Sequence, residues 1–129
     1  MSPREIDAVV RRARSIGIQK VLVDHPYAIV EAAPEQIRAW AELGAYIEFT
    51  AANFAEISVS GNLAPERLKD FMQGLPVDRM VLSSDFGQTR NGSPVAGLRR
   101  FAETVLSFGY SQNDVEQMLK TNASHLLFD

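Results

Sequence analysis

The sequence lacks several features that would mark a common functional class. It contains no cysteine, which excludes disulfide bonds, thiolate metal sites and cysteine nucleophiles. No apolar run approaches the roughly 18 residues of a membrane span, and the first residues lack the basic-then-apolar pattern of a signal peptide. A phosphate-binding glycine loop, a dinucleotide-binding fingerprint and a serine nucleophile elbow are also absent. We therefore expect a soluble, cytoplasmic protein that does not act at a membrane.

The charged residues show no excess of one sign that would indicate a nucleic-acid partner. Thirteen Lys and Arg side chains are interspersed with 16 Asp and Glu side chains, and the formal net charge is −3. A nucleic-acid footprint requires clustered basic residues. The chain has 129 residues, of which 46% are hydrophobic and 22% charged, an ordinary globular balance. These numbers predict one domain over residues 1–129.

Helix and strand patterns alternate along the chain. Helical patterns, with capping or proline signals at their starts, are "SPREIDAVVRRARSIG", "APEQIRAWAELG" and "APERLKDFMQG". Short β-branched or apolar runs follow them in "KVLVDHP", "AYIEF" and "RMVLSSD". Three helical segments are expected to close the chain, at Val95–Phe108, Ser111–Lys120 and Asn122–Phe128. This alternation predicts the α/β class, in which βα units build a parallel sheet with crossover helices.

Polar residues occur at the ends of all three predicted strands. Functional sites of α/β folds lie at the carboxyl ends of the strands, so these residues are the first candidates. Strand alternation predicts that His25, Glu48 and Asp85 converge at one rim, whereas Asp24 faces the other way. An imidazole and carboxylates can bind a divalent metal, with zinc the first expectation and manganese or iron as alternatives. The same groups can also perform metal-free acid–base chemistry.

Each candidate residue also has a purely structural explanation. His25 precedes a proline and could end a strand, and Asp85 could cap a turn. Glu48 could form a salt bridge at the rim, so we assign it only a supporting role. Gln88 could either bind substrate or satisfy its own loop. His125 lies beside two leucines and is interpreted as a packing residue.

Four segments together resemble a known family. In order, "VDHP", "ELGAYIEF", "VLSSDFGQTRNGSPVAGLRRF" and "MLKTNASHLLF" are similar to the C-terminal half of a metal-dependent hydrolase of the amidohydrolase superfamily, in an uncharacterised phosphotriesterase- and TatD-like branch. The resemblance implies a (β/α)₈ barrel with one or two divalent metals at its carboxyl rim. It places His25 on a late-barrel metal ligand and Asp85 on the aspartate that ends the last strand. That aspartate binds metal and takes a proton from the attacking water.

The sequence departs from this family in a way that affects the expected site. The family's H-x-H pair is absent, as are the ligands from the middle of the barrel. His25 and Asp85 alone are fewer than the three protein ligands of a catalytic zinc. Three explanations follow: a fragment, a half-barrel that pairs with another copy or with a separate N-terminal half, or a homologue that has lost catalysis. Two free sheet edges would favour association, so a homo-oligomer or a complementing half is expected.

The resulting functional prediction is a metal-dependent hydrolase-like domain that is incomplete in this chain alone. It would act on an amide, ester or phosphoester bond of a small-molecule substrate through metal-activated water. Asp85 would hold the metal and act as general base, His25 would be a ligand, and Glu48 or Gln88 would orient the substrate. The alternative is a non-catalytic half-barrel that serves as an interaction module.

Overall fold

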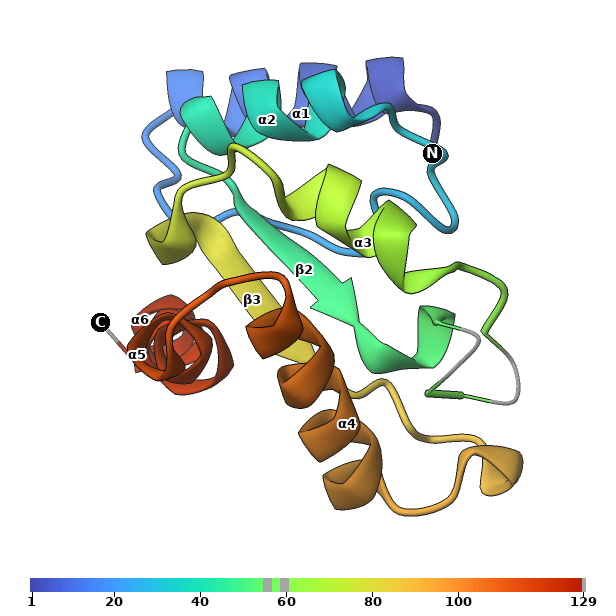
Figure 1. Cartoon of the computed structure of the whole chain (residues 1–129). Coiled ribbons are helices and arrows are strands. Elements are labelled where there is room, and N and C mark those ends of the chain that lie inside the picture. Colours follow the sequence, from blue (N-terminus) through green and yellow to red (C-terminus); the bar gives the residue numbers. More distant parts are fainter. Residues whose placement is uncertain (55–56, 59–60, 129) are drawn as a thin grey trace.

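A computed structural model describes residues 1–54, 57–58 and 61–128 of the chain. Within these residues, β1 (Leu22–Val23), β2 (Tyr46–Thr50) and β3 (Met80–Ser83) form a parallel sheet in the order β1-β2-β3 (Figure 1). Helices connect the consecutive strands, as parallel pairing requires. The predicted α/β class with a parallel sheet is therefore confirmed.

The helices begin close to where the sequence predicts them. They are α1 (Pro3–Ser15), α2 (Pro34–Glu42), α3 (Pro65–Met72), α4 (Pro94–Ser107), α5 (Gln112–Glu116) and α6 (Asn122–Phe128). A π-helical turn, Gln117–Thr121, joins α5 to α6, and short 3₁₀ turns occur at Ala51–Asn53, Val77–Arg79 and Thr89–Asn91. Among the described helices, none has the length and apolarity needed to cross a membrane.

Local signals account for where these helices start and stop. The predicted capping box is present at α1, where the backbone N–H of Ser2 donates to the Glu5 carboxylate and that of Glu5 donates to the Ser2 hydroxyl. Helices α1 to α4 each have proline in the first turn. Gly44 follows α2 at a φ of 91°, a left-handed conformation that glycine adopts without steric cost.

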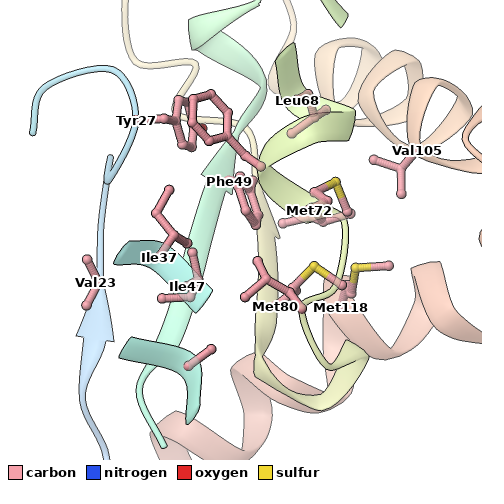
Figure 2. Close-up of a cluster of buried hydrophobic side chains, with 14 of the residues drawn as sticks. Val23, Tyr27, Ile37, Ile47, Phe49, Leu68, Met72, Met80, Val105 and Met118 are labelled. Carbon is pink, nitrogen blue, oxygen red and sulfur yellow. The ribbon is translucent and has the colours of Figure 1, made fainter. Parts of the chain in front are cut away.

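One face of the sheet forms the hydrophobic core. Val23 pairs with Ile47, which in turn pairs with Met80, so these residues share a face. Helices α2 and α3 lie over this face (Figure 1), and the close-up shows α3 and C-terminal residues packing against it (Figure 2). Fully buried side chains in this cluster include Ile37, Ile47, Phe49, Leu68, Met72, Met80, Val105 and Met118. Burial of apolar side chains between this face and the helices therefore stabilises the domain.

The opposite face of the sheet is more polar. Its register aligns Leu22 with Tyr46 and Glu48 with Val81, and Ser83 follows on the same face of β3. Leu22 is 42% exposed, and Glu48 and Ser83 are partly exposed. This face therefore presents polar groups near the carboxyl ends of the strands.

The two edges of the sheet differ. At β3, the buried side-chain amide of Asn122 donates to the carbonyl oxygens of Met80 and Val77, at 2.7 and 2.8 Å. Helix α6 is thereby attached to this edge. At β1, no further strand pairs in the part of the chain that the structure describes. The strand itself, Leu22–Val23, is shorter than the "KVLVDHP" pattern predicts, although the carbonyl of Val21 also accepts the N–H of Tyr46.

Candidate functional site

Both predicted metal ligands lie just beyond a strand, in an uncommon backbone conformation. His25 follows the end of β1 by two residues with a φ of 48°, and Asp85 follows the end of β3 by two residues with a φ of 51°. Left-handed backbone is uncommon for residues other than glycine, although His, Asp and Asn adopt it more readily than most. Such conformations concentrate at functional sites because they re-aim a side chain at some energetic cost. Glu31 shares this conformation, so positive φ alone does not identify the site.

The imidazole of His25 faces two carboxylates. Its Nε2 atom lies 3.5 Å from Oδ2 of Asp24 and 3.6 Å from Oδ2 of Asp85. Both separations exceed the usual 2.7–3.2 Å of a direct N–H···O hydrogen bond. The His25 side chain is 17% exposed, while those of Asp24 and Asp85 are 52% and 42% exposed. The structure therefore brings the predicted pair together in a site that is open to solvent.

Asp24 joins this cluster, which corrects the prediction that it faces away. Continuing the β1–β2 register by one residue pairs Asp24 with Glu48, so the two share the polar face of the sheet. The left-handed backbone of His25 then breaks the strand alternation, and its side chain returns to the same cluster. Alternation alone fails here because it assumes an extended backbone through residue 25.

Glu48 contributes a carboxyl group with a perturbed acidity. Burial raises the pKa of Glu48; the negative charge of Asp24 and a hydrogen bond between the two carboxyl groups act in the same direction, while a Ser83 hydrogen bond and the nearby His25 oppose it. Two carboxyl groups can hydrogen bond only when one of them carries a proton. The folded protein therefore holds the proton of Glu48 more tightly than an ordinary glutamate holds its own.

The other side of the imidazole contacts residues that sequence reasoning missed. Nδ1 of His25 lies 3.0 Å from the side-chain nitrogen of Asn53 and 3.5 Å from the Thr50 hydroxyl. The Tyr27 hydroxyl accepts the backbone N–H of Thr50 at 2.8 Å. Thr50 ends β2 and Asn53 follows three residues later, so the rule that polar residues at strand carboxyl ends form the site would have found both.

Gln88 uses its side chain within its own loop. Its carbonyl oxygen accepts from the Asn91 amide at 2.6 Å, and the Asn91 carbonyl accepts from the Ser58 hydroxyl at 2.7 Å. Gln88 is itself exposed. This geometry corresponds to the second of its two interpretations, a residue that satisfies its loop.

The donor groups fit a divalent metal in kind and spacing but fall short in number. Two ligands of a tetrahedral zinc, each about 2.0–2.1 Å from the ion, lie about 3.3–3.4 Å apart, close to the observed His25–Asp85 separation of 3.6 Å. Among the described residues, however, no group of three or more His, Asp or Glu side chains is arranged to hold a metal ion. A complete site would need ligands from elsewhere.

One hollow of the surface reaches this cluster, since Asp24 lines it together with Leu22 and Val23. A hollow of about 430 Å³ is lined by Lys69, Gln73, Tyr110 and Asp114, among others, where α3 and α4 end. The ends of these helices lie toward the amino ends of the strands, opposite the His25 cluster. The cluster itself is an open rim, because the side chains of Asp24 and Asp85 are 52% and 42% exposed.

Comparison with known proteins gives one partial match. Residues 1–48 match a family of unknown function (DUF6282). The matched segment includes Asp24, His25 and Glu48 but not Asp85, and it covers less than half of the 129 residues. No match was found among curated proteins. Neither result tests the resemblance to the amidohydrolase superfamily, which stays a prediction.

Proposed function

We propose that this chain supplies part of the active site of a metal-dependent hydrolase and that another polypeptide, a second copy or a separate N-terminal half, supplies the rest. The proposal includes the C-terminal half of a (β/α)₈ barrel as the architecture. The observation that carries it is the approach of His25 and Asp85 at the carboxyl ends of a parallel sheet, 3.6 Å apart. Active sites of α/β folds occupy this edge.

Each residue of the cluster has a role in this proposal. His25 and Asp85 would be two of the metal ligands, and the metal would supply activation of water and polarisation of the scissile carbonyl or phosphoryl group. Asp85 is 42% exposed and can accept a proton from an approaching water. Glu48, with its raised pKa, can hold a proton and donate it in a hydrogen bond to substrate.

The test compares the rates at which the wild type and the variant Asp85→Asn hydrolyse amide, ester and phosphoester substrates. Asparagine tolerates the left-handed backbone of position 85, so the variant is expected to fold as the wild type does. Loss of a general base is expected to lower the rate by roughly 100- to 10,000-fold. Asp70→Asn, which changes an exposed carboxylate on α3, is the matched control and is expected to retain the wild-type rate. Wild-type turnover in Asp85→Asn would contradict the proposal.

A metal-free acid–base mechanism is the second candidate, and the raised pKa of Glu48 favours it. With its raised pKa, Glu48 could donate a proton beside Asp24 and His25, which is the kind of arrangement that such chemistry requires. The two candidates differ in their response to a chelator. Activity that survives complete removal of divalent metals and still depends on Glu48 would select this second mechanism.

A further inference from the structure

We propose that a hollow at the amino ends of the strands binds a phosphate group, a role that is independent of the proposed function. The hollow has a volume of about 220 Å³ and is lined by Arg14, Gln19, Lys20, Tyr46, Arg79 and His125. Lys20 lies two residues before β1, Tyr46 begins β2 and Arg79 immediately precedes β3. The hollow therefore lies at the end of the sheet opposite the His25 cluster.

The charge that lines this hollow is positive. Three of its lining side chains are Lys or Arg, and none of its described lining residues is Asp or Glu. Hollows of about 430, 480 and 270 Å³ elsewhere on the surface each include a carboxylate, from Asp114, from Glu35 and Asp70, and from Asp24. The whole chain has a net charge of −3, so its composition alone does not account for this concentration of cations. An anion that enters the hollow meets cations without a competing carboxylate.

Arg14 is held in place without being neutralised. Its Nη1 atom donates to the side-chain oxygen of Gln19 at 2.7 Å and to the backbone carbonyl of Gln19 at 3.2 Å. Both acceptors are uncharged. The guanidinium also packs closely on Gly44, where a Cβ atom would lie 3.1 Å from Cζ of Arg14. Within the described part of the chain, no salt bridge joins Arg14 or Lys20 to a carboxylate.

Arg79 is oriented by an aromatic ring. Its guanidinium carbon lies 5.0 Å from the centre of the Tyr46 ring, and Tyr46 is buried. A cation over a ring face is attracted by the ring and keeps its charge. The nearby carboxylate of Asp78 lies 3.8 Å from Nε of Arg79, beyond hydrogen-bond distance, and its side chain is 60% exposed. The charge of Arg79 therefore remains available to a ligand.

The size and donors of the hollow favour a phosphate group over other anions. Guanidinium groups present planar forks of N–H donors that match phosphate oxygens, and lysine adds a compact positive charge. A phosphate monoester carries close to two negative charges on three oxygens, so it can satisfy more of these donors than a single carboxylate can. The volume is below the roughly 300–1,000 Å³ of pockets for larger ligands. We therefore expect phosphate itself or a small phosphate ester.

The experiment titrates the protein with inorganic phosphate and, separately, with methyl phosphate, in chelator at about pH 8, where both are mainly dianions. Backbone amide signals are followed in ¹H–¹⁵N spectra, with chloride keeping the ionic strength constant. Saturable shifts are expected at Arg14, Lys20, Tyr46 and Arg79. Arg14→Gln is expected to weaken binding roughly 10-fold or more, because a charged hydrogen-bond donor is lost. Arg99→Gln removes the same charge from an exposed position on α4 and is expected to bind as the wild type does.

The wild-type titration alone can overturn the proposal, even if Arg14→Gln fails to fold. Shifts that do not saturate, or that occur equally around Arg99, would contradict a site in this hollow. Wild-type affinity in folded Arg14→Gln would contradict it as well.

A second variant separates this site from the proposed active site. Asp85→Asn is expected to bind phosphate as the wild type does, and weaker binding in that variant would place the anion at the rim and overturn the proposal. Tighter binding of methyl phosphate than of phosphate would identify an ester as the ligand, and equal or weaker binding would identify the free ion. Both results uphold a phosphate site.

Discussion

The conformations of single residues decide where the chemistry of this protein lies. His25 and Asp85, both in left-handed backbone, approach each other from the carboxyl ends of β1 and β3, on either side of β2. An extended His25 would follow the alternation of β1 and would share the core face with Val23, away from Asp24. The cluster thus depends on a local departure from regular structure at His25.

The first residue-scale prediction concerns Glu48 and pH. Burial raises the folded-state pKa of Glu48 above the ordinary value of 4.5, so the folded protein binds this proton more tightly than the unfolded chain does. The contribution of Glu48 to the free energy of unfolding of the wild type is therefore greatest at low pH. It is lost as the pH rises through the folded-state pKa of Glu48. Glutamine cannot ionise, so Glu48→Gln is expected to gain stability relative to wild type as pH rises from about 4 to 7.

Urea unfolding at both pH values, in chelator, measures this difference. Glu42→Gln, at an exposed position on α2, is the control for a lost charge and is expected to show a smaller pH-dependent gain. An equal stability difference between Glu48→Gln and wild type at both pH values would show that Glu48 does not hold its proton more tightly in the folded state.

The second residue-scale prediction concerns Gly97 on α4. A Cβ atom at this position would overlap the ring of Phe86, the residue that follows Asp85. Gly97→Ala is expected to destabilise the protein by about 1–2 kcal/mol, because overpacking outweighs the better helix propensity of alanine. Gly87→Ala is the control, since a Cβ there meets nothing within 4 Å. Equal thermal stability of the two variants would contradict this packing account.

How much of the site the sequence predicts can be seen from these same residues. The rule that polar residues at the carboxyl ends of parallel strands lie close together correctly predicted the approach of His25 and Asp85. The position of Asp24 was predicted wrongly, since no local pattern shows that His25 leaves the extended conformation. The contact between Asn53 and His25 was missed because it joins residues 28 positions apart through a turn.

At the scale of elements, the domain depends on how α6 is attached to the sheet. The Asn122 amide, 4% exposed, donates to two backbone carbonyls that precede and begin β3. The π-helical turn before it, Gln117–Thr121, changes the phase of the terminal helix. The sequence pattern predicts helix before and after this turn. Nothing recognisable in the sequence predicts the π-helical turn itself.

Asn122→Ala is therefore expected to destabilise the protein by about 1–3 kcal/mol, the range for leaving buried polar groups without a partner. Asn113→Ala, at an exposed position of α5, is the matched control and is expected to change stability by less than about 0.5 kcal/mol. Chemical unfolding of both variants provides the comparison. Equal midpoints for Asn122→Ala and wild type would mean that the two carbonyls find other partners at no cost.

At the scale of the whole molecule, the two sheet edges are unequal. The β3 edge is covered by α6, whereas Leu22 on β1 is 42% exposed and lies in a hollow with Met1 and Val9, which are 69% and 52% exposed. An open edge flanked by apolar side chains favours association with another strand. A partner at this edge would also lie close to Asp24, where the site lacks ligands.

We therefore expect the isolated chain to self-associate through β1. Leu22→Lys places a charge on the open edge and is expected to reduce the apparent mass in light scattering after size separation. Val95→Lys changes another exposed apolar residue, 72% exposed on α4, and is expected to leave the mass unchanged. A monomeric wild type would contradict association between copies and would leave a separate N-terminal half as the expected partner.

The proposed function is tested most directly by metal content per chain, measured by plasma mass spectrometry on size-resolved protein grown with zinc. The account predicts about one metal per chain in an associated form, and its loss in Asp85→Asn but not in Asp70→Asn. The absence of metal from every size fraction would contradict the account.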